Sequence, residues 1–115
     1  MGLSKSKKRG TSKGDAFEKY VMHRLGQSGF LRVTHTGKSG DFGADIICYD
    51  RHLRKIVIQC KYYSKPVGIS SVQEVNAARQ YYNAVRAVVV TNSTFTASAK
   101  KLAASCRVEL EEKFH

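Results

Sequence analysis

Two apolar segments joined by a short polar turn constrain the fold of this chain more than any other feature of its sequence. Residues 44–49 (ADIICY) and 55–63 (KIVIQCKYY) are rich in the β-branched and aromatic residues that favour strands. The turn between them, residues 50–54 (DRHLR), is short enough to predict an antiparallel hairpin. A hairpin alone is marginally stable in water, so the rest of the chain must supply elements that cover it.

The segments around this hairpin alternate between helical and extended patterns. Residues 85–91 (VRAVVVT) lack alternation and are rich in valine, which predicts a strand covered on both faces. Elsewhere the pattern predicts helices at 15–28 capped by Asp15, at 70–83 and from Thr94 or Thr96 to 105, strands at 30–34 and 107–110, and a glycine-rich loop at 36–43. The order helix, three strands, helix, strand, helix, strand predicts an α/β or α+β domain with a mixed central sheet flanked by helices.

The charge of the chain narrows the class of partner. Its 115 residues include 20 lysines and arginines against 9 aspartates and glutamates, a formal net charge of +11. Such an excess favours a polyanionic partner, with nucleic acid first, and leaves an anionic membrane surface or ribosomal RNA open. The length fits a single domain, predicted at 15–115, which follows a flexible basic arm at 1–14.

Other classes of protein are disfavoured by what the sequence lacks. No apolar run approaches the roughly 18 residues that cross a bilayer, and no apolar signal segment follows the basic N-terminus, which predicts a soluble, cytoplasmic protein. The three cysteines, Cys48, Cys60 and Cys106, are far apart and form no C-x-x-C pair. We therefore expect neither a disulfide framework nor a zinc site, and we expect Cys48 and Cys60 to be buried small residues.

The predicted hairpin brings three polar side chains together. If its turn is centred on His52, Asp45 lies opposite Gln59, and Lys61 lies opposite Gly43. Gln59 and Lys61 are two residues apart and project to one face of their strand, which Asp45 shares as the cross-strand partner of Gln59. A shift of one residue in the pairing would separate these side chains, so the register is part of the prediction.

These residue types suit metal-assisted cleavage of a phosphodiester bond. Magnesium, for which Mn²⁺ can substitute, prefers carboxylate, amide and backbone carbonyl oxygens. Asp45 would anchor the ion, and Gln59 and the carbonyl of Cys60 would assist. Lys61 would support the attacking water or balance the charge that grows on phosphorus. Glu18, on the first predicted helix, would hold a metal-bound water.

Other interpretations of these residues stay open at this point. A Q-x-K pair in a strand is usually an exposed polar face, and the spacing between Asp45 and Gln59 arises by chance in many chains. Small neighbours at Gly43 and Ala44 favour the catalytic interpretation, because a phosphate backbone can approach them closely. His35, near the glycine-rich loop, is expected to be a surface histidine. Candidate contacts with nucleic acid are Lys13, Lys38, Ser39, Lys65 and Gln73.

At these residues the sequence resembles a known family. The segments SGDFGADIICYD, KIVIQCKYYSKPVGISSVQEV and YYNAVRAVVVTNSTFTASAKKLA are similar, in this order, to the catalytic domain of the Mrr-type restriction endonucleases, which belong to the PD-(D/E)xK nuclease superfamily. The resemblance extends over about residues 14–110. Asp45 matches the aspartate of their G-x-D segment, and Glu18 matches the glutamate of their first helix. Residues 59–61 match their Q-x-K motif, in which glutamine stands where most of the superfamily has an acid.

The resemblance implies an α/β fold with a restriction-endonuclease-like core (α-β-β-β-α-β), magnesium-dependent hydrolysis of DNA and frequent homodimers. Two departures from the family are expected to matter. Relatives usually carry a separate DNA-recognition domain, and none is expected here. Phe42 occupies a position where the family often has glycine, which should affect the packing of the loop.

Three hypotheses of function follow from the sequence. The first is a DNA endonuclease of the restriction type, and the second is a Holliday-junction resolvase with the same chemistry but a branched substrate. The third is a DNA-binding module that has lost catalysis. The presence of Asp45, Gln59 and Lys61 together favours the two catalytic hypotheses.

Overall fold

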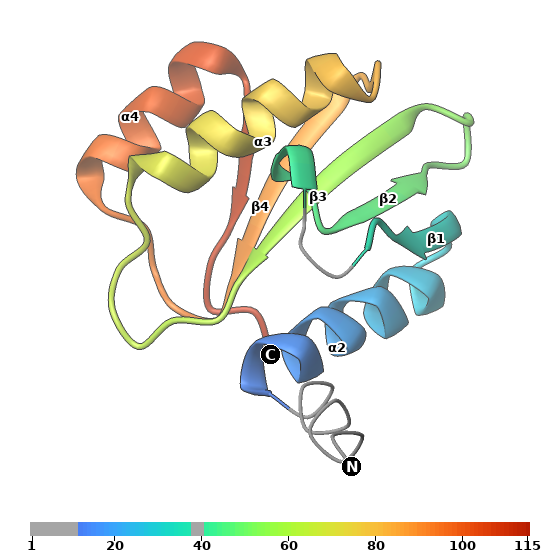
Figure 1. Cartoon of the computed structure of the whole chain (residues 1–115), viewed down its shortest axis with the longest axis horizontal. Helices are drawn as coiled ribbons and strands as arrows, with labels where there is room; N and C mark the ends of the chain where they lie inside the picture. The colour runs from blue at the N-terminus through green and yellow to red at the C-terminus, as the bar shows by residue number, and fades with distance from the viewer. Residues whose placement is uncertain (1–11, 38–40) are drawn as a thin grey trace, which may run out of the picture.

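The computed structural model describes residues 12–37 and 41–115, which form a mixed five-stranded sheet with helices on both faces (Figure 1). The strands are Leu31–His35 (β1), Ile46–Tyr49 (β2), Lys55–Lys61 (β3), Arg86–Thr91 (β4) and Glu109–Glu111 (β5). They lie in the order β1-β2-β3-β4-β5. β1, β2 and β3 pair antiparallel, whereas β3, β4 and β5 pair parallel. The mixed sheet predicted from the sequence, and with it the α/β class, is confirmed.

The β2–β3 hairpin has the register expected from the sequence. Ile46 pairs with Ile58 and Tyr49 pairs with Lys55, so the turn is centred where it was predicted. The backbone N–H of Asp45 donates to the carbonyl oxygen of Ile58 at 2.8 Å and extends the pairing to the residue that precedes β2. Asp45 therefore enters the sheet beside the end of β3.

Helices cover both faces of the sheet. α2 (Lys13–Gln27) packs on one face, and α3 (Ile69–Tyr81) and α4 (Ala97–Cys106) lie together on the other (Figure 1). α3 connects β3 with β4 and α4 connects β4 with β5, which is the usual way to join parallel neighbours. Among the residues that the structure describes, no helix is long and apolar enough to cross a membrane.

Each face of the sheet has its own apolar core. On the α2 side, Phe17 and Val21 of the helix pack against strand residues that include Ile46 and Ile58. The core on the α3 and α4 side contains Val57, Val72, Val75, Ala78, Ala87, Val89, Ala99 and Ala103. β3 is consequently buried along both faces, and Gln59 is the polar residue within its buried stretch. A glutamine in such a position needs hydrogen-bond partners.

The first helix begins earlier than predicted. α2 starts at Lys13, because the side chain of Ser12 accepts a hydrogen bond from the backbone N–H of Asp15 at 3.0 Å and caps the helix. Asp15 is therefore an acid of the first turn, where the helix dipole favours it, and the prediction that it is the cap is wrong. The helix includes the end of the predicted basic arm, whose residues 1–11 lie outside the described residues. Thr96 caps α4, which selects between the two predicted caps.

A short 3₁₀ helix, η1 (Asp41–Gly43), precedes β2 and packs on α3. Gly43 has a φ of +80°, and a Cβ atom there would lie 2.2 Å from the carbonyl oxygen of Glu74. Only glycine permits this approach of one backbone to another. Phe42 also has a positive φ, 66°, and its ring stacks on Tyr81 with 3.9 Å between the ring centres. Phe42 thus contributes to the packing of the loop, as expected.

Candidate active site

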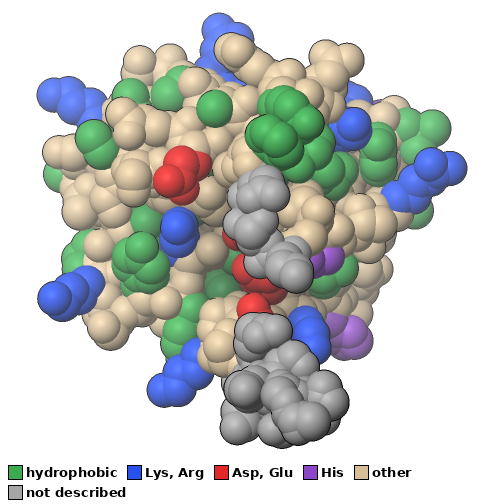
Figure 2. All heavy atoms as spheres, viewed as in Figure 1, with side chains coloured by type: hydrophobic (Ala, Val, Ile, Leu, Met, Phe, Trp, Pro, Cys, Tyr) green, Lys and Arg blue, Asp and Glu red, His purple; other side chains and the backbone are tan. Residues whose placement is uncertain are grey.

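A pocket of about 430 Å³ lies where the start of β2 meets the end of β3. Its lining residues come from α2, η1, β3 and α3 and from the residue before β2: Glu18, Gly43, Asp45, Gln59, Cys60, Lys61 and Glu74. Figure 2 shows acidic side chains toward the middle of one face of the molecule, with lysines and arginines around its rim. The pocket brings together every side chain that the sequence predicted for catalysis and adds Glu74.

Asp45 is held in this pocket by one hydrogen bond. The backbone N–H of Cys60 donates to Asp45 Oδ2 at 2.8 Å, and no other hydrogen bond reaches this carboxylate within the described residues. Burial raises the pKa of Asp45 above its usual value, although the Cys60 N–H and the positive charge of Lys61 act in the opposite direction. A carboxylate with a raised pKa and few donors is one that a bound cation would stabilise.

Gln59 is fixed between two acceptors. Its Nε2 donates to the carbonyl oxygen of Gly43 and to Glu74 Oε1, each at 3.1 Å. Both neighbours are acceptors, so they determine the orientation of the amide: Nε2 faces them, and neither can donate a hydrogen bond to Oε1. Gln59 is only 5% exposed, and its Oε1 is buried with no hydrogen-bond partner among the residues that the structure describes. Such an oxygen is destabilising in a protein interior, which points to a ligand that supplies a positive partner.

Cys60 and Lys61 complete the edge of β3. The N–H and C=O of one residue leave the same side of a strand, so the Cys60 carbonyl is directed to the side where its N–H meets Asp45. The Cys60 thiol lies in the core on the α2 side, and burial followed by the negative charge of Asp45 raises its pKa well above the usual value. It is therefore a buried, unreactive thiol, as predicted. Lys61 Nζ is 5.9 Å from the ring centre of Tyr63.

Glu18 reaches the pocket from α2 and is paired with a histidine. Glu18 Oε1 lies 2.6 Å from His35 Nε2, and the backbone N–H of Gly37 donates to His35 Nδ1 at 3.2 Å. In the neutral ring the proton therefore lies on Nε2, which donates it to Glu18. Burial raises the pKa of Glu18, the hydrogen bond from His35 lowers it, and the charge of Asp45 raises it. His35 is exposed, as predicted, and it also orients Glu18.

The oxygens around the pocket fit a divalent cation that prefers hard ligands. Asp45 and Glu18 supply carboxylates, and Gln59 and Cys60 supply an amide and a backbone carbonyl oxygen. In the part of the chain that the structure describes, no group of three or more His, Cys, Asp and Glu side chains is arranged to hold a metal ion. The neutral oxygens are therefore needed to complete a shell, and the unpartnered Gln59 Oε1 is suited to that purpose. This donor set resembles a magnesium site more than a zinc site, which uses nitrogen and sulfur.

Three of the five residues predicted to contact nucleic acid are described by the structure, and none of these three lines the pocket. The side chains of Lys13, Lys65 and Gln73 are exposed and do not line it. Lys38 and Ser39 lie outside the described residues. Glu74, which follows Gln73, is the site residue that the sequence reasoning missed. It is the only acid of α3, the helix that follows the Q-x-K strand, and that position is the signal that could have found it.

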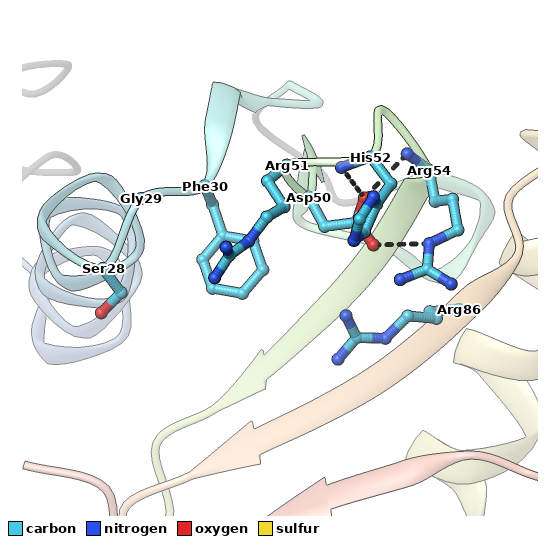
Figure 3. A pocket seen from close by; sticks show the side chains of 8 residues that line it. All are labelled: Ser28, Gly29, Phe30, Asp50, Arg51, His52, Arg54 and Arg86. Atoms are coloured by element: carbon cyan, nitrogen blue, oxygen red, sulfur yellow. Dashed lines mark hydrogen bonds and ion pairs between the residues drawn. The ribbon is translucent and has the colours of Figure 1, made fainter.

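A second hollow, of about 250 Å³, lies at the other end of the hairpin, where its turn meets the end of α2 (Figure 3). It is lined by three arginines, Arg51, Arg54 and Arg86. Arg54 Nε donates to Asp50 Oδ2 at 2.8 Å, and Arg86 forms two hydrogen bonds with Glu109 at 2.8 and 2.9 Å. Carboxylates therefore neutralise two of these arginines. Gln59 Oε1, the buried side-chain oxygen that has no partner among the described residues, belongs to the first pocket and not to this hollow.

Comparison with known proteins decides the family. Residues 10–113 match the model of the Mrr catalytic domain, which is described as a restriction endonuclease. The chain belongs to the Mrr-type restriction endonuclease family. The type IV methyl-directed restriction enzyme EcoKMrr of Escherichia coli K12 is 35% identical to it over 88 residues. The match covers 74% of this chain and 29% of that enzyme, so the chain corresponds to less than a third of its relative.

Solved structures of nucleases have the same fold as this Mrr-type chain. A repair endonuclease from Pyrococcus abyssi superposes with a TM-score of 0.63 at 20% identity, over 88% of this chain and 47% of the other. EndoMS in complex with double-stranded DNA superposes with a TM-score of 0.65 at 18% identity, over 86% of this chain and 44% of the other. At these identities the likeness establishes the fold, which is the restriction-endonuclease-like core expected from the sequence.

Proposed function

We propose that this chain is a metal-dependent endonuclease that hydrolyses phosphodiester bonds in DNA, with magnesium as its ion and manganese as a substitute. The observation that carries the proposal is the pocket in which Asp45, Lys61 and the unpartnered Oε1 of Gln59 meet. Membership of the restriction endonuclease family and the net charge of +11 support DNA as the substrate.

The residues of the pocket would divide the work of hydrolysis. Asp45, the amide oxygen of Gln59 and the carbonyl of Cys60 would hold the ion. When bound, the ion supplies Lewis-acid activation of the phosphate and of a water molecule. Lys61 would donate hydrogen bonds to the attacking water or to the phosphate oxygens, where its charge offsets the negative charge of the transition state. Glu18, with one oxygen bonded to its histidine partner, keeps the other to accept a hydrogen bond from that water.

Basic and polar residues would hold the DNA backbone. The candidates are Lys13, Lys38, Ser39, Lys65 and Gln73. Lys13→Ala and Lys65→Ala should each weaken binding to all sequences alike and reduce the dependence of affinity on salt by about one unit of slope. Gln73→Ala removes no charge and should leave that slope unchanged. Equal slopes for all three variants would remove the two lysines from the proposed interface.

Cleavage of both strands of a duplex requires two active sites. We therefore infer that the chain acts as a two-fold homodimer on DNA. Light scattering of the protein alone and with a duplex tests this inference, with two copies per duplex expected. A single copy per duplex, combined with products cut in one strand only, would contradict it.

The proposed function is tested with a labelled panel of DNA substrates in magnesium and in EDTA. The panel contains linear duplex, methylated duplex, single strand and a four-way junction. The methylated duplex is included because the relative in Escherichia coli is methyl-directed, and the junction because a resolvase is the alternative substrate hypothesis. Each substrate is incubated with wild type and with Asp45→Ala.

Cleavage that requires both magnesium and Asp45 is the expected result, and the preferred substrate then separates the restriction and resolvase hypotheses. Tight, salt-dependent binding without cleavage of any substrate would contradict the proposal. That outcome would leave the DNA-binding module without catalysis as the function of the chain.

A further inference from the structure

We propose that Glu74 is a metal ligand of this site and supplies the carboxylate that the Q-x-K strand does not provide. The inference rests on the metal-dependent function proposed above and assigns one of its ligands. Gln59 is a neutral amide, so β3 contributes no negative charge beside Asp45. α3 returns a carboxylate to the same pocket through Glu74.

The position of Glu74 is set by backbone packing. Gly43 lets η1 approach α3 so closely that a Cβ atom would lie 2.2 Å from the Glu74 carbonyl oxygen and 2.8 Å from its carbonyl carbon. The carbonyl oxygen of Gly43 and Glu74 Oε1 then accept hydrogen bonds from the same Gln59 Nε2. The Glu74 carboxylate is thus held at the glutamine and does not sample the surface freely.

The chemistry of the pair favours a shared cation. Nε2 of Gln59 is used by its two acceptors, which leaves the buried Oε1 without a partner among the described residues. Glu74 is an exposed residue, so an ion can reach it from solvent. Glu74 and Asp45 both line this pocket, so the two carboxylates border the same space. Two nearby carboxylates and an unpartnered amide oxygen are stabilised together by a divalent ion.

A purely positioning role for Glu74 is the alternative, in which its only task is to orient the Gln59 amide. Glu74→Gln separates the two roles, because the new amide oxygen can still accept from Gln59 Nε2 while the charge is lost. Glu111→Gln on β5 is the matched control, since it makes the same chemical change at an exposed acid outside the pocket. The double variant Gln59→Glu with Glu74→Gln moves the carboxylate from α3 to β3 and can reverse the hydrogen bond.

The experiment measures Mn²⁺ affinity of the full chain by calorimetry and by electron paramagnetic resonance, together with the thermal midpoint without metal. Glu74→Gln should bind Mn²⁺ about tenfold more weakly or worse, with an unchanged metal-free midpoint. Glu111→Gln should bind like wild type, and the double variant should recover most of the lost affinity. Wild-type affinity in Glu74→Gln would overturn the inference and leave Glu74 as a positioning residue.

The outcomes separate this inference from the proposed function. If wild type binds Mn²⁺ and Glu74→Gln binds it equally well, the ligand assignment fails while a metal-dependent nuclease remains. If wild type binds Mn²⁺ but cuts no DNA, the nuclease proposal fails and the affinities still decide the role of Glu74. If wild type binds no Mn²⁺, both fail together.

Discussion

The two ends of β2 each carry an aspartate, and the two carboxylates are held in opposite ways. At the turn, Asp50 Oδ1 accepts from the backbone N–H groups of His52 and Arg54 at 2.8 and 3.0 Å, and Oδ2 accepts from Arg54 Nε at 2.8 Å. These bonds, that of the Arg54 N–H above all, hold the pKa of Asp50 below its usual value. At the other end, Asp45 has one backbone donor and a pKa raised by burial.

The contrast separates an acid whose partners lie within the protein from an acid that we propose binds a ligand. Asp50 meets donors that the hairpin turn itself provides, so its charge is balanced within the protein. Asp45 lines the same pocket as Gln59, whose Oε1 has no hydrogen-bond partner among the described residues. Sites that destabilise the empty protein are typical of function, since selection for activity can outweigh the local loss of stability.

Asp45→Asn is the change that should test this contrast most strongly. The amide keeps the shape of the side chain but removes the anchoring charge, so single-turnover cleavage in magnesium should slow by at least about a thousandfold. Asp50→Asn makes the same chemical change at the other end and should leave the rate within about twofold of wild type, because its partners do not reach the pocket. Similar losses in both variants would show that the two acids do not differ in role.

Gly43→Ala should disturb the candidate active site through packing. The added Cβ meets the Glu74 backbone at 2.2 Å and sits at a φ of +80°, so we expect the free energy of unfolding to fall by about 1–3 kcal/mol. Gly26→Ala is the matched control, since its Cβ would meet nothing within 4 Å inside α2. It should raise the free energy of unfolding by about 0.5–1 kcal/mol. Denaturant unfolding of both variants measures the difference, and equal effects would count against the tight contact of η1 with α3.

The candidate active site was predicted from the sequence as far as local geometry reaches. The short turn fixes the register, and the alternation of a strand then puts Gln59, Lys61 and Asp45 together, which the structure confirms. Glu74 could not be found in this way, because it reaches Gln59 only through the packing of α3 on η1 at Gly43. Gly43 and Glu74 are far apart in the sequence, and no local sequence pattern predicts that their backbones meet.

The first helix illustrates a different limit. Ser12 and Asp15 are both good N-caps, and propensity alone does not choose between them. In the structure Ser12 is the cap: its hydroxyl accepts a hydrogen bond from the Asp15 N–H, and α2 therefore begins at Lys13. The buried strands, whose apolar pattern is long and unambiguous, were predicted with small errors at their ends.

Asp50→Asn should weaken the fold even though it spares cleavage. The neutral amide cannot accept three hydrogen bonds as the carboxylate does, so the thermal midpoint should fall by roughly a few degrees. Because the pKa of Asp50 is lowered in the folded state, its contribution is present above the unfolded value of about 4 and is lost as the pH falls through the folded pKa. The gap between wild type and variant should therefore close in acid. If the difference in thermal midpoint between wild type and Asp50→Asn is unchanged at low pH, the charge of Asp50 does not cause that difference.

The smallest effects should come from the two strained residues that sit at opposite ends of the hairpin. Leu53 in the turn and Phe42 in η1 have φ values of 63° and 66°, and both side chains are exposed. Glycine removes the strain of a left-handed backbone but adds entropy to the unfolded chain, so Leu53→Gly should stay within about 0.5 kcal/mol of wild type. Phe42→Gly also loses the stack on Tyr81 and should be less stable than Leu53→Gly by about 1 kcal/mol.

Denaturant unfolding of the two glycine variants and of Phe42→Leu decides how the stack contributes. Leucine keeps the strain and an apolar side chain at Phe42 but removes the ring, so it should be at least as destabilising as glycine there. If Phe42→Gly and Leu53→Gly have equal free energies of unfolding, the Phe42 ring contributes nothing to stability and does not offset the backbone strain in η1. If Phe42→Gly is less stable than Leu53→Gly, the aromatic contact holds η1 on α3. The candidate active site is then stabilised by packing on its outer surface, whereas the acids inside it contribute no such stability.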